Sequence, residues 1–545
     1  MSGTVVENLS TKKLLHLCCC LFILLIIFFL LGAFLSPQPS SSMEFILLKC
    51  IDREGGQNPN SWFYLRPPHC DIIHDLDHYT PKTNDMRDIV FVAQMPHQRE
   101  GVTLEYSAWF QFLLGLLEVD IEYDSKFDLV ENANLMLEVR LGYQVNTDKP
   151  GVWHEMISTN ITRKLECIPP EPRNDGHLYS CQSIDLFELG SNPYPFYLIN
   201  IRLPVDPVLC RHDPKGPNCA IGRIKDLRLI AIHQNGGFTA VWLWMKTFVT
   251  PFVIIAVCWY WRRIGALNRR PYLIEYSIFT LGLSLAILDF PMEWISLWTR
   301  TPLMLLLGDI RQGLFYSILL CFWLIFTGEH LIDDTSRNNL ASYWRNLTSV
   351  IVASGSLLVY DMAERGMQLS NPFFSIWASE FGSALAYTAV YIAAFCAFLY
   401  FFFLTYKVIK VWLTIKSKRA GQLYKTNENR RLKVEAVLYR FKFLMFFTLI
   451  CAAFTIASYI MKQYGETQMH NADSDDSLLM HSTSAFFTGT FGMWNIYVVL
   501  LLAMYAPSHK QYSNATLLNE ETTDLMDGTN MEASSLTTFV KPATD

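Results

Sequence analysis

The stretch LLHLCCCLFILLIIFFLLGAFL, residues 14–35, contains no Asp, Glu, Lys or Arg and is long enough to cross a bilayer as a helix. It exceeds the roughly 7–15 apolar residues of a signal-peptide core, and no small-residue cleavage site follows it. Lys12 and Lys13 precede it, so we expect an uncleaved transmembrane helix with residues 1–13 in the cytosol.

Seven further apolar segments occupy the second half of the chain, which makes eight predicted spans in total. The loops that would face the cytosol are basic, above all between residues 407 and 442, whereas the loop around Asp475 is acidic. Both termini are therefore predicted to be cytosolic, by the positive-inside rule. Residues 238–506 would form the helical part and residues 507–545 a disordered tail. The seven spans are predicted near residues 239–261, 272–295, 303–328, 347–364, 383–406, 440–461 and 484–505.

The composition agrees with this distribution. Of the 545 residues, 51% are hydrophobic and 17% are charged, whereas soluble domains carry about 25% charged residues. The formal net charge of −6 gives no general basic character, so we predict no nucleic-acid partner. A wholly soluble enzyme and a disordered protein are both disfavoured.

Residues 36–237 lie between the first two spans and are predicted to form a luminal domain, large enough for one core. Several of its segments alternate between apolar and polar residues with a period of two, which is typical of half-buried strands. We expect a β-sandwich or an open barrel. The clearest examples are DIVFVAQM (88–95), LMLEVRLGYQV (135–145), FYLINIRLPV (196–205) and IKDLRLIAI (224–232).

Six of the 13 cysteines fall in this domain, and an even number in an oxidising compartment favours disulfides. Fifteen pairings are possible. We expect the local ones because short loops close easily: Cys50 with Cys70, Cys167 with Cys181, and Cys210 with Cys219. Asn160-Ile161-Thr162 is a glycosylation sequon on the luminal side.

Ionisable residues within or near the spans admit an enzymatic interpretation. Asp361 follows Tyr360, and Asp309 follows Gly308, as in intramembrane aspartyl proteases. However, the first glycine of the Gly-x-Gly-Asp element is replaced by Leu306, and the order of the two elements is reversed. Helix capping, mutual ion pairs or contacts with headgroups explain such residues better, so we treat the motif match as coincidence and keep an intramembrane hydrolase only as an alternative.

Two other classes of membrane protein are alternatives. The last seven spans match a seven-helix signalling receptor with an added N-terminal helix, although no Asp/Glu-Arg-Tyr motif ends a cytosolic helix. A transporter would show internal repeats, and the sequence shows none.

Aromatic residues gather near the luminal ends of the later spans. They fit either an interfacial aromatic belt or an apolar cavity that is open to the lumen and accepts a hydrophobic ligand. The candidates for such a cavity are Phe315, Phe373, Phe374, Trp377, Phe486, Phe487, Phe491 and Trp494, with Phe381 nearby.

Long segments of the chain resemble the Wntless family of Wnt sorting receptors, in the family's order. They include WFQFLL (109–114), HQNGGFTAVWLWMKTFVTP (233–251), GDIRQGLFYSILLCFWLIFTGEH (308–330), ERGMQLSNPFFSIW (364–377) and SAFFTGTFGMWNIYV (484–498). The resemblance implies a luminal β-sandwich beside eight helices, the last seven receptor-like. It implies a non-enzymatic carrier without cofactors that cycles between endoplasmic reticulum, Golgi, plasma membrane and endosomes.

The same resemblance implies the partners. Acylated Wnt proteins would bind with the protein part on residues 101–235 and the acyl chain in the membrane cavity. Clathrin adaptors, retromer and membrane lipids would be further partners. For the protein part we single out Trp109, Phe110, Phe112, Tyr197 and Arg202.

The sequence departs from the family at two places. The family carries a Tyr-Glu-Gly-Leu endocytic signal where this chain has Val434-Glu435-Ala436-Val437. Our hypothesis is that Glu521, Leu525 and Met526 form an acidic dileucine-like substitute in the tail. The Cys210/Cys219 pair, which we do not associate with the family, suggests an extra stapled luminal loop.

Overall fold

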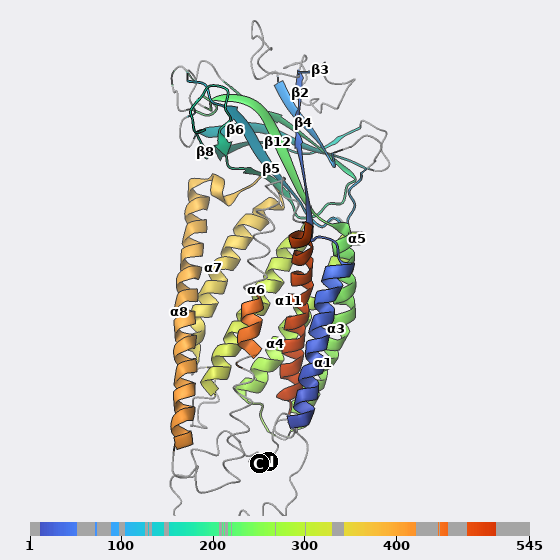
Figure 1. Cartoon of the computed structure of the whole chain (residues 1–545), viewed down its shortest axis with the longest axis vertical. Coiled ribbons are helices and arrows are strands. Elements are labelled where there is room, and N and C mark those ends of the chain that lie inside the picture. The colour runs from blue at the N-terminus through green and yellow to red at the C-terminus, as the bar shows by residue number, and fades with distance from the viewer. Residues whose placement is uncertain are drawn as a thin grey trace, which may run out of the picture.

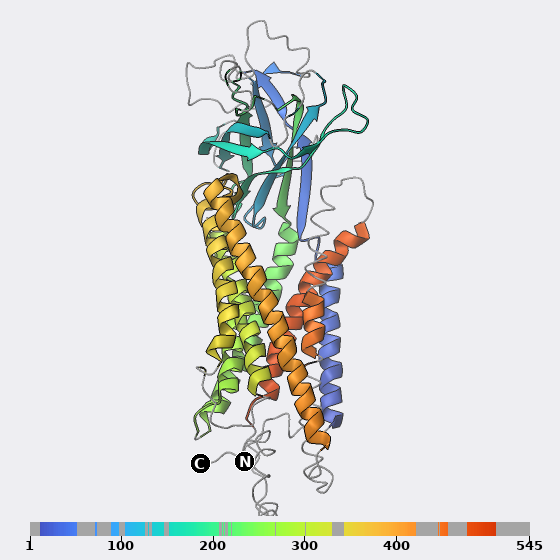
Figure 2. The ribbon, with the colours of Figure 1, turned by 90° about the vertical axis from the view of Figure 1, so that its left-hand side faces the viewer.

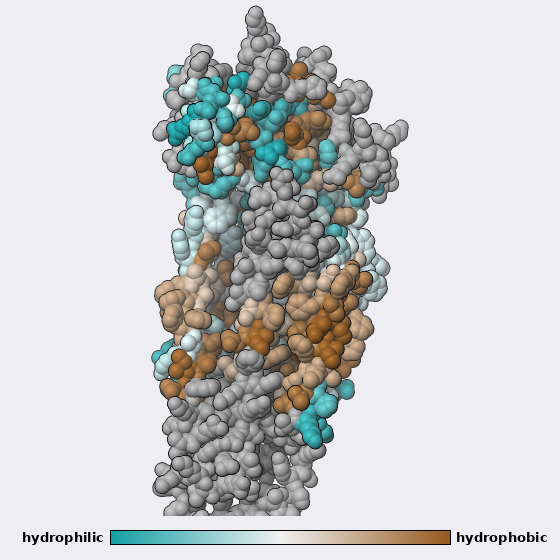
Figure 3. Space-filling view, in the orientation of Figure 1, coloured by the Kyte–Doolittle hydropathy of each residue, from teal (hydrophilic) through white to brown (hydrophobic). Residues whose placement is uncertain are grey.

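The structure is a computed structural model of the chain. It describes residues 11–51, 71–73, 89–97, 104–125, 129, 133–145, 152–205, 210, 212, 216–219, 221–267, 269–299, 301–329, 340, 343–420, 445, 447–455 and 477–507. A β domain stands at one end of a bundle of long helices (Figure 1). Apolar residues dominate the visible surface of the helices and polar residues that of the β domain (Figure 3).

The β domain consists of two facing antiparallel sheets. One has the strand order β1-β12-β5-β10 and the other the order β3-β2-β4-β11-β6-β7, while β8 and β9 form a short hairpin. The strands are β1 (Ser40–Ile46), β2 (Leu48–Ile51), β3 (Asp71–Ile72), β4 (Ile89–Met95), β5 (Leu113–Glu122), β6 (Asn134–Gln144), β7 (His154–Lys164), β8 (Cys167–Ile168), β9 (Ser180–Cys181), β10 (Ile184–Leu189), β11 (Phe196–Arg202) and β12 (Arg223–Gln234).

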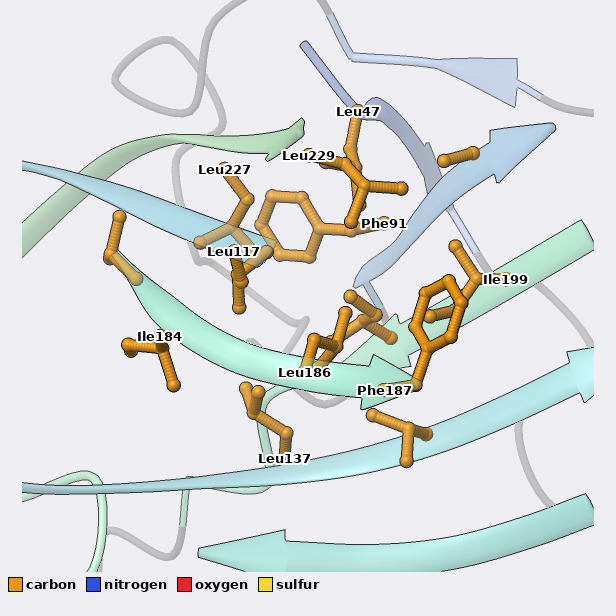
Figure 4. Close-up of a cluster of buried hydrophobic side chains, with 14 of the residues drawn as sticks. Leu47, Phe91, Leu117, Leu137, Ile184, Leu186, Phe187, Ile199, Leu227 and Leu229 are labelled. Carbon is orange, nitrogen blue, oxygen red and sulfur yellow. The ribbon is translucent and has the colours of Figure 1, made fainter. Parts of the chain in front are cut away.

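The core of this domain explains why the period-two pattern predicted strands. Along β6 the burial alternates between buried and half-buried residues, because successive side chains point to opposite faces of a sheet. Inward residues from both sheets meet in one apolar cluster, part of which is shown in Figure 4. The predicted β-sandwich is thus confirmed, and the four quoted segments form β4, β6, β11 and β12.

The helices are α1 (Thr11–Leu30), continued by the π-helical turn η2 (Leu31–Leu35), then α3 (Gly236–Gly265), α4 (Leu273–Asp289), α5 (Glu293–Trp298), α6 (Met304–Glu329), α7 (Trp344–Gln368), the 3-10 turn η6 (Ile376–Ala378), α8 (Glu380–Ala420) and α11 (Ser477–Met504). Seven candidate membrane spans occur in the described residues. Of the predicted span 440–461, residues 447–455 are helical and most of the remainder lies outside the described residues.

The helices lie below the β domain. In Figure 1 α7 and α8 run side by side, apart from the first helix α1 and its neighbour α11, whereas Figure 2 shows the lower end of α8 crossing toward α1. A single residue, Asn235, separates the Gln234 end of β12 from the start of α3, so β12 leads directly into the helical bundle. The helical part therefore starts at Gly236 rather than at residue 238.

The disulfides agree with the local pairing where the structure describes both partners. Cys167 is bonded to Cys181, and Cys210 is bonded to Cys219. Cys50 is also disulfide-bonded, but its expected partner Cys70 lies outside the described residues.

Candidate functional site

The β domain meets the helices at a first junction where β12 runs into α3. The Asn235 side chain caps α3 by accepting a hydrogen bond from the Gly237 N–H at 3.0 Å. The rings of Trp109 and Trp294 lie 6.2 Å apart edge to face, and Ser296 Oγ donates to Gln111 Oε1 at 3.1 Å. The segment before β5 is therefore docked on α5.

His233 lies at the centre of this first junction. Its ring packs edge to face against Tyr106 at 5.3 Å and against Phe110 at 5.2 Å. Its Nδ1 is buried without a hydrogen-bond partner among the described residues. Burial lowers the pKa of His233 from 6.5 to about 4, because this apolar setting disfavours the imidazolium. At neutral pH the ring is uncharged.

A second junction is made by the loop between α7 and η6. Phe373 from this loop is 1% exposed and packs into the β-domain core, 5.8 Å from Phe187. The Glu188 N–H donates to the Pro372 carbonyl at 2.9 Å, so the loop occupies the open edge of β10. Arg163 Nη2 donates to the Phe373 carbonyl at 2.7 Å. A side chain from the helical part thus completes the core of the β domain.

Arg365 near the end of α7 reinforces the second junction. It forms ion pairs with Glu188 of β10 and, at 3.7 Å, with Asp309 of α6. Glu364, its neighbour, accepts a hydrogen bond from the Ile376 N–H at 2.7 Å. One of the two carboxylates of the hydrolase interpretation, Asp309, is therefore part of an ion pair that links α6 to α7.

Three further charged side chains form an intramembrane ion cluster: Lys246, Glu293 and Arg311. Glu293 Oε1 lies 2.7 Å from Lys246 Nζ and 3.2 Å from Arg311 Nη2. Lys246 and Arg311 are 6% and 8% exposed. Asp289 is fully buried beside this cluster. Buried charges of this kind persist only when paired, and here the pairing joins α3, α5 and α6.

A group of aromatic side chains remains accessible at the β-domain end of α7 and α8. We call it the α7–α8 aromatic patch, and its described members are Tyr360, Trp377, Phe381, Tyr387 and Tyr391. The Trp377 ring lies 6.3 Å from Tyr360 and 5.2 Å from Tyr387. Trp377 is 43% exposed and Phe381 81%. This patch starts just beyond the second junction.

The structure does not bring the eight predicted lipid-contact residues together. The prediction for Phe373 is wrong, because the ring fills the core of the β domain. Phe315 and Trp494 pack on each other inside the bundle at 5.9 Å. The remaining α11 residues pack on other helices: Phe486 on Phe29, Phe487 on Phe238 and Phe491 on Phe28. Of the eight, Trp377 is exposed, and Phe374 is half-buried, as are Phe486 and Phe487.

The residues predicted to contact the protein part of the acylated partner also lie in different surroundings. The prediction for Tyr197 is wrong, because this side chain is 0% exposed and packs within the β-sandwich. Trp109 and Phe110 pack within the first junction, on Trp294 and His233 respectively. Phe112 and Arg202 are half-buried and remain candidates.

Two other predicted sites have different outcomes. Asn160 is exposed on β7, where a glycan would project into solvent. The tail residues Glu521, Leu525 and Met526 lie outside the described residues.

Both parts of the chain, the β domain and the helical part, match descriptions of known protein families. Residues 48–234 match the family description "Wntless, GOLD domain", and residues 235–509 match "Wntless-like, transmembrane domain". The chain belongs to the Wntless family. It is 55% identical to a protein wntless homolog of Caenorhabditis elegans over 100% of each chain. It is 42% identical to a protein wntless homolog of Homo sapiens, over 94% of this chain and 92% of that one.

The Wntless assignment confirms the resemblance found in the sequence, and with it a multi-span membrane protein with a role related to Wnt secretion. Sequence reasoning overlooked both junctions. Hydropathy alone cannot show that Phe373, which follows Asn371-Pro372, enters a distant sheet. The interruption SNPFF, between two long apolar helices, was the available signal.

Proposed function

We propose that the protein is a sorting receptor that binds acylated Wnt proteins and carries them to the cell surface. The observation that carries the proposal is the α7–α8 aromatic patch, which stays accessible directly below a β domain fixed by two junctions. Its relatives from worm and human are both named as wntless homologs.

The physical reason for such a carrier is the acyl chain. Each buried methylene is worth about 0.8 kcal/mol, so exposing a palmitoleoyl chain to water costs on the order of 10 kcal/mol. A secreted cargo with this chain would stay on membranes or aggregate. The aromatic patch would contact the chain within the bilayer, where exposed rings such as those of Trp377 and Phe381 offer a large apolar area.

The β domain would hold the protein part of the cargo on residues 101–235, through surfaces that the junctions leave free. Phe112 and Arg202 are the remaining candidates from the sequence. We place this domain in the lumen and both termini in the cytosol, because the opposite ends of the helices are rich in Lys and Arg. We assign no catalytic step to any residue.

Transport implies recycling through plasma membrane, endosomes, Golgi and endoplasmic reticulum. Clathrin adaptors and retromer would recognise the cytosolic segments, with Glu521, Leu525 and Met526 as the endocytic signal. Alanine at Leu525 and Met526 should slow uptake from the cell surface in an antibody-uptake assay. Unchanged uptake would reject this signal and leave the carrier function intact.

The carrier function is tested by co-purification of the full chain with Wnt. A double variant, Trp377→Ala with Tyr387→Ala, should recover at least about tenfold less acylated Wnt, since each lost aromatic contact is worth about 0.5–1.5 kcal/mol beyond area burial. Wnt that lacks its acylated serine should bind weakly to wild type and be insensitive to the variant.

The matched control is Trp261→Ala, which removes a ring of similar exposure, 43%, from the opposite end of the helices. It should leave recovery unchanged. Equal recovery of acylated and unacylated Wnt by wild type would overturn the lipid-contact mechanism. A loss of recovery with the control as large as with the double variant would assign the effect to general destabilisation.

A further inference from the structure

The ends of the helices that point away from the β domain form a strongly basic surface. Because consecutive helices alternate in direction, the end of α3 and the start of α4 lie at this level, together with the start of α7 and the end of α8 (Figures 1 and 2). The last turn of α3 and the connection to α4 carry Arg262, Arg263, Arg269 and Arg270 within nine residues. We call Arg262, Arg263 and Arg270 the α3–α4 basic cluster.

Exposed tryptophans mark where this surface meets the membrane boundary. Trp259 and Trp261 on α3 are 41% and 43% exposed, and Trp344 at the start of α7 is 60% exposed. Tryptophan rings prefer the headgroup level of a bilayer. The guanidinium of Arg263 lies over the Trp259 ring at 4.9 Å, and Arg262 follows Trp261 directly. The basic cluster is therefore at headgroup level.

The described carboxylates at this end do not neutralise the cluster. Glu275 is buried and accepts two hydrogen bonds from the fourth arginine, Arg269, at 2.9 and 2.7 Å. It also accepts from the Tyr272 N–H at 2.8 Å. The Glu275 carboxylate is thus occupied by hydrogen bonds within the turn. Arg262 and Arg270 remain exposed.

Helix α8 gives the same end a second basic element. Its 41 residues would extend about 61 Å at about 1.5 Å per residue, whereas the hydrocarbon core is about 30 Å thick. The helix therefore continues past the membrane boundary, and its sequence there includes Lys407, Lys410, Lys416, Lys418 and Arg419. Lys407 and Lys410, whose side chains the structure describes, add cations to this end of the helices.

We propose that the α3–α4 basic cluster binds the headgroups of anionic phospholipids in the leaflet opposite the β domain. Arginine binds phosphate and carboxylate oxygens through several N–H donors at once, and the tryptophans beside it hold the turn at the depth of those groups. A zwitterionic lipid would bring its own cation against the cluster. The structure thus assigns this turn a lipid preference, separate from any contact with a transported acyl chain.

The test uses the full chain reconstituted in phosphatidylcholine bilayers with a trace of spin-labelled lipid. Electron paramagnetic resonance measures the fraction of label that is immobilised at the protein. Spin-labelled phosphatidylserine should associate about threefold to fivefold more strongly than spin-labelled phosphatidylcholine, since a basic residue at the surface changes affinity by about this factor. In the variant R262Q/R270Q this preference should fall toward one.

The charge-matched control is R223Q/K225Q, which removes two exposed cations from β12 in the β domain. It should retain the full preference. Equal association of the two lipids with wild type, or an unchanged preference in R262Q/R270Q, would overturn the proposal. So would abolition of the preference by inorganic phosphate beyond the effect of sodium chloride at equal ionic strength, because that would indicate a site for free phosphate.

Discussion

At the residue scale, side chains of the same type have different roles in different parts of the fold. Phe373 and Trp377 are four positions apart, and both read as aromatic residues at a membrane boundary. Phe373 is 1% exposed in the β-sandwich core, whereas Trp377 is 43% exposed in the turn η6 between α7 and α8. No local pattern separates them, because the difference depends on where the open edge of β10 lies.

The pH dependence of stability is a prediction at this scale. The folded-state pKa of His233 is about 4, below its ordinary value of 6.5, so between these values the unfolded chain binds a proton that the folded chain does not. This contribution is therefore complete above pH 6.5, and stability falls as the pH drops toward 4. The maximum loss is about 3 kcal/mol.

Thermal unfolding of the full chain in detergent at pH 7.5 and pH 5 checks this prediction. His233→Phe, which keeps a ring between Tyr106 and Phe110, should show a smaller decrease of Tm on acidification than wild type. An identical decrease in both proteins would mean that other groups cause the acid sensitivity.

At the scale of elements, the packing of α1 on α11 depends on glycine. A Cβ at Gly492 would overlap the ring of Phe28, and a Cβ at Gly489 would overlap that of Phe29. Thr488 Oγ1 also donates to the Phe28 carbonyl at 2.8 Å. The first span is therefore held in the bundle by the close approach that TGTFG, residues 488–492, allows.

Gly492→Leu should weaken this helix pair. The new side chain must displace Phe28, at a cost of about 1–3 kcal/mol, which should lower the Tm by several degrees. Gly313→Leu on α6 is the matched control, because no atom lies within 4 Å of a Cβ there. Equal effects of the two substitutions would show that helix propensity, rather than packing on α1, determines the result.

At the scale of the whole molecule, two junctions determine how the β domain sits on the helices. One follows the chain from β12 into α3, and the other inserts the α7–η6 loop into the sandwich. The second gives the α7–α8 aromatic patch a fixed place relative to the β domain. A carrier that holds a protein and its lipid at once requires such a fixed separation.

Phe373→Ala should loosen the second junction. Loss of a buried phenylalanine costs about 3–5 kcal/mol, so amide exchange in β10 and residues 371–376 should accelerate about a hundredfold or more where it proceeds by local opening. Hydrogen exchange with mass spectrometry measures this, and the half-buried Phe374→Ala should change the same peptides far less. Unaltered exchange in β10 would show that Phe373 does not stabilise the edge.

The sequence by itself determined the place of most spans, the β-sandwich, two of the three predicted local disulfides and the family. These follow from properties of contiguous segments: apolar length for spans, period-two alternation for strands, short loops for cysteine pairs. Only the tertiary structure decided which aromatic residues are buried in cores and which stay accessible. That outcome depends on contacts between residues such as Phe187 and Phe373, which are far apart along the chain, and hydropathy is equal for a ring in a protein core and a ring facing lipid.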